Sequence, residues 1–298
     1  MKSIPLKKIH KFLRHKKKFP HVWCAGCSNG IVLGSTIRAI ADMGYEKDNI
    51  VMVSGIGCSS RMPVYVDFNT LHTLHGRAIA YATGVKLAKP NMEVIVVTGD
   101  GDATAIGGNH LIHAARRNIN ITVILVNNYI YGMTGGQYSP TTPLNDLSST
   151  TPYGNMDPSF DICELAMGAG ASFVARTSAY HVVEMQSFIK QAFEHKGFSL
   201  IEIISACPVI YGRLNKKGTA PEMMMWMKKN IIPIKAYEKL EPEEQESKIS
   251  RGVLRKIEKP EYVEQYSKLI ASLQPKGEKS EPKDSTAKRA EGEKNDDK

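Results

Sequence analysis

The 298-residue sequence contains no apolar run of about 18 residues, which a membrane-spanning helix needs. Its N-terminus is basic but lacks an apolar segment behind the charges, so it does not resemble a secretory signal. We therefore expect a cytoplasmic protein without a membrane partner. Cysteine is also scarce, and five cysteines, an odd number, argue against a disulfide framework in such a chain.

Acidic residues are absent from residues 1–21, which hold eight lysines and arginines. Much of the net charge of +9 therefore sits on one terminal arm. The sequence contains no recognisable nucleic-acid-binding motif, so we expect no nucleic-acid partner. The arm is either a solvated tail or a docking segment for an acidic partner.

One β-α-β unit is predicted between residues 94 and 137. Val94–Thr98 is an unbroken β-branched run, typical of a buried strand, and an acidic glycine turn follows it. Helical spacing extends over Ala103–Arg117, and a second apolar strand is predicted over Ile121–Val126. In such units the loops at the carboxyl ends of the strands hold the ligand.

Oxygen-bearing side chains follow both strands of this unit. Asp100 ends the first strand and Asn128 follows the second, and a parallel crossover places these two ends side by side. Carboxylate, amide and backbone carbonyl oxygens suit Mg²⁺. Two ordinary surface turns are the simpler alternative. An EF-hand is excluded because Leu111 stands where its last, bidentate glutamate belongs.

Strand and helix patterns alternate along most of the chain, which predicts an α/β fold with a parallel sheet covered by helices on both faces. The Gly55–Ser60 turn is superficially similar to a dinucleotide-binding fingerprint, but Ser60 replaces its third small residue and Pro63 disturbs the following helix. Besides the β-α-β unit, strands are expected over 49–54, near 173–175 and over 200–204. Helices are expected over about 78–87, 162–167 and 180–194, and another is expected between a cap at Ser28 or Asn29 and its end at Gly44.

Composition divides the chain into four parts. Residues 1–21 form the basic arm, and residues 22–210 form the α/β domain. Residues 211–274 are expected to be a C-terminal extension at a subunit interface, because methionines cluster there and charges alternate with sparse apolar positions. Residues 275–298 contain only charged, polar and small residues, so we expect a disordered tail.

The cysteines suggest a metal site without defining it. Cys24 and Cys27 form a C-x₂-C turn, but the second pair that a zinc knuckle needs is missing. Cys58 and Cys207 each follow a predicted strand, so they can reach the edge of the sheet where Asp100 lies. A cluster with four thiolates, a zinc ion or no metal all remain open. Cys163 lies in an apolar helix and is expected to be buried.

Together these motifs resemble a known family. The Gly99-Asp100-Gly101 turn followed by Asn127-Asn128 resembles the thiamine-diphosphate (ThDP) binding motif of ThDP-dependent enzymes. The loop Tyr131–Gln137 and the cysteine motifs at Trp23–Cys27, Gly55–Cys58 and Cys207-Pro208 resemble the β subunits of 2-oxoacid:ferredoxin oxidoreductases. The resemblance covers about residues 20–212. Met133 is similar to the residue in the 2-oxoglutarate branch of the family.

The resemblance implies an oxidoreductase β subunit that decarboxylates a 2-oxo acid oxidatively. The best guess is 2-oxoglutarate, converted to succinyl-CoA with CoA as co-substrate. ThDP and Mg²⁺ would be bound, and a 4Fe–4S cluster would pass single electrons to ferredoxin. The implied cluster ligands are Cys24, Cys27, Cys58 and Cys207, and Asp100, Asn128 and the Ile130 carbonyl would bind Mg²⁺. The residues expected around the cofactors are Gly57, Cys58, His75, Gly99, Asp100, Gly101, Asp102, Asn128, Ile130, Gly132, Met133 and Thr134.

Two further residues are catalytic candidates. His75 precedes a helix and would contact the diphosphate or the substrate, unless it is a structural histidine. Arg61 lies three residues after Cys58 and could hold a substrate carboxylate in bidentate fashion, unless it is an ordinary surface arginine. ThDP enzymes also need a glutamate beside the aminopyrimidine ring, and no glutamate here suggests that role. We therefore expect it from an α subunit, in a heterodimer or an α₂β₂ assembly.

Two other functions compete with this interpretation. One is a non-redox ThDP-dependent decarboxylase or lyase subunit, in which the cysteines bind zinc or nothing. The other is a non-catalytic interaction module stapled by a metal, in which Gly99-Asp100-Gly101 is only a turn.

Overall fold

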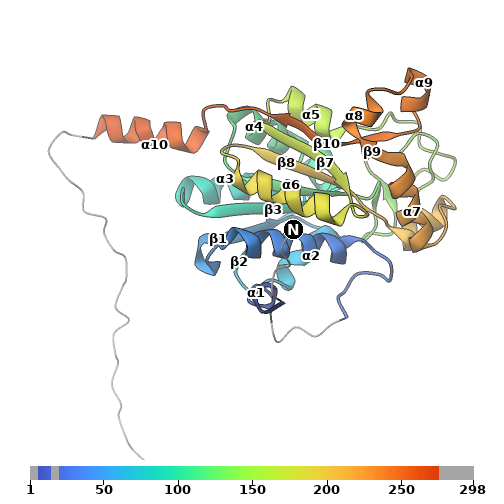
Figure 1. Cartoon of the computed structure of the whole chain (residues 1–298), viewed down its shortest axis with the longest axis horizontal. Coiled ribbons are helices and arrows are strands. Elements are labelled where there is room, and N and C mark those ends of the chain that lie inside the picture. The colour runs from blue at the N-terminus through green and yellow to red at the C-terminus, as the bar shows by residue number, and fades with distance from the viewer. Residues whose placement is uncertain (1–5, 15–19, 275–298) are drawn as a thin grey trace, which may run out of the picture.

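The computed structural model describes residues 6–14 and 20–274 of the chain, so the tail expected over 275–298 lies outside the described residues. Within this part, eight strands form one sheet in the order β2-β1-β3-β4-β8-β7-β10-β9 (Figure 1). Neighbours from β2 to β7 are parallel. The strands are β1 (Ile50–Ser54), β2 (Asn69–His72), β3 (Glu93–Gly99), β4 (Thr122–Asn127), β7 (Phe173–Ser178), β8 (Ser199–Ile204), β9 (Ile231–Pro233) and β10 (Ile249–Lys256).

Helices cover both faces of the sheet, as predicted. Successive residues of a strand point to opposite faces, so Ile95 and Val97 of β3 pack in one apolar cluster while Val94 and Val96 pack in another. The first cluster lies under α2 (Asn29–Met43) and α6 (Val182–Glu194). The second lies under α3 (Ala78–Ala88), α4 (Gly108–Arg117) and α5 (Ile162–Gly168).

Two local predictions near the β-α-β unit need correction. The helix expected over Ala103–Arg117 is broken, because a π-helical turn spans Asp102–Ile106 and α4 begins only at Gly108. The turn carries the buried carboxylate of Asp102, and π-helical turns are frequent at functional sites. The strand β2 was not predicted, because it is short, polar and partly exposed at the edge of the sheet.

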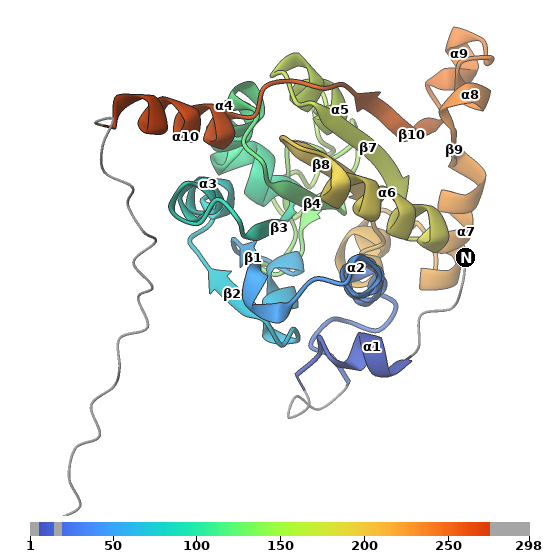
Figure 2. The ribbon, with the colours of Figure 1, turned by 60° about the vertical axis from the view of Figure 1, so that its left-hand side comes forward.

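The chain beyond residue 210 returns to the sheet. The C-terminal extension expected over 211–274 contains β10, which pairs antiparallel with β7. The helices α7 (Ala220–Asn230), α8 (Ile234–Tyr237) and α9 (Pro242–Gln245) gather beside β9 at that end, and α10 (Tyr262–Leu273) projects from the body (Figures 1 and 2). Part of the predicted C-terminal extension is therefore integral to the fold.

The described part of the basic arm also packs on the domain. After α1 (Leu6–His10), Phe12 is buried with 3% of its surface exposed. The backbone N–H of Arg14 donates to the carbonyl of Tyr65 over 3.0 Å, and that of Asp67 donates to the carbonyl of Phe12 over 2.8 Å. The described arm, residues 6–14, is thus anchored to the segment Tyr65–Asp67, which follows Cys58 in the chain.

Parallel pairing determines where the functional side chains meet. The carboxyl ends of β1, β3, β4 and β8 lie at one edge of the sheet because these strands are parallel neighbours. The segments that follow them carry Cys58, Asp100, Asn128 and Cys207 in that order. Among the described residues, we find no helix with the length and apolar character needed to cross a lipid bilayer.

Candidate cofactor and metal site

A cavity of about 520 Å³ opens at this edge of the sheet. Its walls come from the loops after β1, β2, β3 and β4 and from the short hairpin of β5 (Ile130–Tyr131) and β6 (Gln137–Tyr138). Every residue that the sequence suggested for cofactor binding lines it. The lining comprises Ile56, Gly57, Cys58, Ser59, His75, Gly99, Asp100, Gly101, Asp102, Val126, Asn128, Ile130, Tyr131, Gly132, Met133, Thr134 and Gln137.

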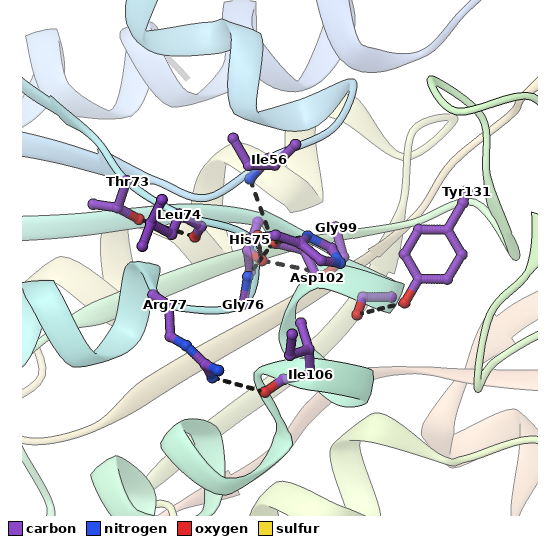
Figure 3. Close-up of polar contacts among 12 residues, drawn as sticks. Ile56, Thr73, Leu74, His75, Gly76, Arg77, Gly99, Asp102, Ile106 and Tyr131 are labelled. Atoms are coloured by element: carbon purple, nitrogen blue, oxygen red, sulfur yellow. Dashed lines mark hydrogen bonds and ion pairs between the residues drawn. The ribbon is translucent and has the colours of Figure 1, made fainter.

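Asp102, in the wall of the cavity, connects three loops through polar contacts (Figure 3). Its Oδ1 accepts hydrogen bonds from the backbone N–H of Gly76 over 2.7 Å and of Ile56 over 3.3 Å. Its Oδ2 accepts from the Thr98 hydroxyl over 2.7 Å, and His75 Nδ1 lies 2.7 Å from Oδ1. These partners occupy the carboxylate, so Asp102 holds the loops and places His75 at the wall of the cavity.

Asp100 is different, because no basic side chain among the described residues pairs with its buried carboxylate. Only 3% of Asp100 is exposed, and burial raises the pKa of its carboxyl group, against hydrogen bonds from Ser139 and Thr141 that lower it. None of the ion pairs among the described residues involves Asp100. A bound cation would stabilise the ionised carboxylate here. Asn128, 9% exposed, lines the same cavity and offers an amide oxygen.

The glycine-rich loop, Tyr131–Gln137, contacts the acidic turn Gly99–Asp102 directly. The Tyr131 hydroxyl donates to the carbonyl of Gly101 over 3.0 Å. A Cβ atom on Gly101 would lie 2.2 Å from Cζ of Tyr131, so a glycine is required for this approach. Tyr129, at the start of the loop, has a left-handed φ of 65°, a strained conformation that is commonest at functional sites.

Four cysteines gather beside the cavity. A Cβ atom on Gly132 would lie 3.5 Å from Cys207 Sγ and 3.7 Å from Cys58 Sγ, so the glycine-rich loop passes close to both sulfurs. The Trp23 indole donates to the carbonyl of Cys58 over 2.6 Å, which brings the C-x₂-C turn onto the same loop. Ser28 Oγ accepts from the backbone N–H of Ala206 over 3.0 Å and joins that turn to the end of β8.

The pKa shifts of the buried thiols indicate that the four cysteines lie near one another. Burial raises the pKa of Cys58 to about 12, and the neighbouring Cys27, Cys207 and Cys24 add to this effect. Burial likewise raises the pKa of Cys27 and of Cys207. Thiols in such a setting stay protonated until a metal displaces the protons. Since Cys58 also lines the cavity, the cysteine site and the cavity share a wall.

A second group of metal-binding side chains is already paired with an arginine. Asp161, Cys163 and Glu202 lie together, but the Arg176 guanidinium bonds both carboxylates, with 2.7 Å between Nε and Glu202 Oε2. An arginine thus stands where a cation would bind. Cys163 is fully buried, as predicted, and its thiol donates to Glu202 over 3.2 Å.

The two catalytic candidates differ in position. His75 lines the cavity, whereas Arg61 is absent from its lining and is only partly exposed. Of the described residues that line the cavity, none is a glutamate.

The sequence did not point to Ser139 and Thr141, whose hydroxyls donate to Asp100. Asn127, whose amide oxygen lies beside Thr141, was named only as part of the Asn127-Asn128 motif. The run of Ser, Pro and Thr after the glycine-rich loop was the only available signal.

Comparisons with known proteins agree with this geometry. The family model described as thiamine pyrophosphate enzyme, C-terminal TPP binding domain, matches residues 55–203; thiamine pyrophosphate is another name for ThDP. The 2-oxoglutarate synthase subunit KorB of Methanothermobacter thermautotrophicus is 50% identical over 266 residues, which cover 89% of this chain and 93% of that protein. The 2-oxoacid:ferredoxin oxidoreductase subunit beta of Saccharolobus solfataricus is 38% identical over 238 residues, with 79% and 77% covered.

A solved structure extends the likeness to three dimensions. It is the 2-oxoglutarate:ferredoxin oxidoreductase from Magnetococcus marinus with 2-oxoglutarate, coenzyme A and succinyl-CoA bound. The TM-score is 0.79 at 36% sequence identity, with 89% of this chain and 90% of that chain covered.

The contact between Gly101 and Tyr131 predicts a selective effect of added methyl groups. Gly101→Ala should lower the free energy of unfolding by about 1–3 kcal/mol, because the new Cβ overlaps the tyrosine ring. Gly99→Ala is the matched control, since its Cβ would meet Ser59 Oγ at an ordinary 3.5 Å. Thermal or denaturant unfolding measures both variants. Equal stability of the two would contradict the packing described.

Proposed function

Because the chain belongs to the β subunits of the 2-oxoacid:ferredoxin oxidoreductases, we propose that it holds ThDP, Mg²⁺ and one 4Fe–4S cluster in an enzyme acting on 2-oxoglutarate. The observation that carries this proposal is the shared wall between the cavity and the four cysteines, formed by Cys58 and Gly132. An oxidative decarboxylation needs an electron acceptor next to the cofactor, and this arrangement provides the place for one.

In this proposal the residues of the acidic turn would hold the diphosphate end of the cofactor. Asp100, Asn128 and the Ile130 carbonyl would hold Mg²⁺, which binds few protein ligands and completes its shell with phosphate oxygens and water. ThDP, when bound, supplies the electron sink for decarboxylation. Gly99 and Gly101 keep the turn narrow, and Asp102 holds His75 beside the cofactor. The remaining wall at Gly57, Gly132, Met133 and Thr134 would enclose the cofactor.

The substrate assignment is supported by relatives rather than by the cavity alone. The similar proteins include subunits of 2-oxoglutarate enzymes, and the similar structure carries 2-oxoglutarate, coenzyme A and succinyl-CoA. We infer the same conversion for this chain, with CoA as the acyl acceptor. Arg61 remains a candidate for binding a substrate carboxylate, together with a surface from the partner subunit.

An α subunit would complete the active site. The cavity wall offers Asp100 and Asp102 but, over the described part of the chain, no glutamate for the aminopyrimidine ring. The segment 211–274 is a candidate surface for this subunit, because Met225 and Trp226 of α7 are 53% and 46% exposed. Ferredoxin, as an acidic electron acceptor, would suit the basic arm, where Lys8, Lys11 and Arg14 are exposed.

Serine substitutions should separate cluster ligands from the structural cysteine. Replacing Cys24, Cys27, Cys58 or Cys207 by serine should lower iron content and the broad visible absorbance, because each removes one thiolate. Cys163→Ser is the matched control and should retain iron, since Cys163 faces Glu202 in the core. Iron analysis of the anaerobically purified subunit pair measures this. Full iron in Cys207→Ser would remove that residue from the ligand set.

Removing the Asp100 carboxylate should abolish ThDP binding while the cluster stays in place. The remaining oxygens would hold Mg²⁺ too weakly to offset the charge of the diphosphate. Calorimetry with ThDP and Mg²⁺ compares Asp100→Ala with Asp48→Ala, an exposed aspartate away from the cavity. Unchanged ThDP affinity in Asp100→Ala would show that the metal site is wrongly placed.

A further inference from the structure

Two buried hydroxyls from the loop after β6 converge on Asp100. Ser139 and Thr141 are 1% and 2% exposed. The Ser139 hydroxyl donates to Asp100 Oδ2 over 2.6 Å, and the Thr141 hydroxyl donates to the same oxygen over 2.7 Å. The hydroxyl oxygens lie 2.9 Å apart. Both donors therefore act on one side of the carboxylate.

This arrangement constrains the other side. A carboxylate presents about four lone-pair positions on its two oxygens. With Oδ2 taken by two hydroxyls, the carboxylate cannot rotate without breaking short, charge-assisted bonds. Because Ser139 and Thr141 are buried, water cannot readily replace either donor. The orientation of Oδ1 is thus determined by the loop, before any cation arrives.

The amide oxygen of Asn127 also contacts the Thr141 hydroxyl. Thr141 Oγ1 lies 3.0 Å from Asn127 Oδ1. The Asn127 amide nitrogen donates to Glu202 Oε1 over 2.8 Å, and Glu202 is paired with Arg176. An ionised carboxylate only accepts, so the Asn127 nitrogen must face Glu202 and its oxygen must face Thr141.

The single Thr141 proton then has two acceptors, Asn127 Oδ1 and Asp100 Oδ2. The charged acceptor gives the stronger bond, and the 2.7 Å contact is the shorter of the two. Asn127 Oδ1 has another donor, the backbone N–H of Tyr129 over 3.2 Å. Asn127 Oδ1 therefore has a donor of its own, and the Thr141 proton is left for Asp100.

The loop does not need the Thr141 hydroxyl for its own closure. The neighbouring Thr142 hydroxyl donates to the carbonyl of Tyr129 over 2.6 Å, and its carbonyl accepts from the Asn155 amide over 2.8 Å. The Ser139 backbone N–H also donates to Thr142 Oγ1 over 2.8 Å. Thr142 fastens the loop, whereas the Thr141 hydroxyl is directed to Asp100.

We propose that Thr141, together with Ser139, is a positioning residue that orients the Asp100 carboxylate for Mg²⁺. This rests on the proposed function, because it takes Asp100 as a ligand of the cation that binds the diphosphate. Neither hydroxyl touches the substrate in this role. Their effect is on the affinity for the cation.

The test is a Mg²⁺ titration of ThDP binding by the purified subunit pair, freed of divalent cations and kept anaerobic. Thr141→Val keeps the shape of the side chain and removes the hydroxyl. It should raise the Mg²⁺ concentration for half-maximal ThDP binding by about tenfold or more, since a hydrogen bond to a charged group is lost. Thr141→Ser restores the hydroxyl and should stay within about threefold of the parent.

Two further variants complete the design. Thr36→Val is the matched control, because the buried Thr36 hydroxyl donates to a backbone carbonyl within α2, and it should titrate like the parent. Ser139→Ala provides a second test if Thr141→Val loses iron or fails to fold, and it should shift the titration in the same direction. Iron content is measured in every variant, because a general loss of structure would lower it.

The outcomes separate the two proposals. If the parent depends on Mg²⁺ but Thr141→Val and Ser139→Ala both titrate like it, the positioning role is wrong while the proposed function stands. The same holds if Thr141→Ser is as impaired as Thr141→Val. If ThDP binding by the parent does not depend on Mg²⁺, the metal site fails and this inference fails with it.

Discussion

The buried carboxylate of Asp100 is the constraint on which the rest of the site depends. A charged group taken out of water must be compensated, and here no basic side chain of the described chain is paired with it. Two loop hydroxyls supply part of the compensation. A cation bound with a diphosphate cofactor would compensate the rest of the Asp100 charge. The acidic turn can stay narrow because Gly101 admits the Tyr131 ring, and Asp102 anchors the loops around it.

Parallel pairing explains why one chain can combine two kinds of site. The carboxyl ends of β1 and β8 deliver Cys58 and Cys207, and the ends of β3 and β4 between them deliver Asp100 and Asn128. Cofactor cavity and cysteines are therefore neighbours by topology, and Gly132 lets the intervening loop pass close to both sulfurs. No glutamate lines the cavity in the described part of the chain, which fits a subunit of a larger enzyme.

Much of this could be predicted because it depends on local pattern and strand order. Val94–Thr98 was recognised from its β-branched run, and Asp100 and Asn128 were expected to meet because a parallel crossover requires it. Ser139 and Thr141 were not predicted, since their loop has no periodicity and its contacts arise only in the folded chain. The strand β10 was missed for a similar reason: its pairing with β7 joins segments far apart in sequence, and its register shifts between Val253 and Arg255.

The central claim is that the cavity and the cysteine cluster form one electron-transfer unit. An anaerobic single-turnover experiment tests it most directly: the purified subunit pair, loaded with ThDP and Mg²⁺, is mixed with 2-oxoglutarate and CoA without ferredoxin, and the cluster is followed by visible absorbance and electron paramagnetic resonance. The account predicts that the cluster is reduced when the 2-oxo acid is added, and that it stays oxidised when ThDP is omitted. Release of carbon dioxide from 2-oxoglutarate with a cluster that stays oxidised throughout would contradict it.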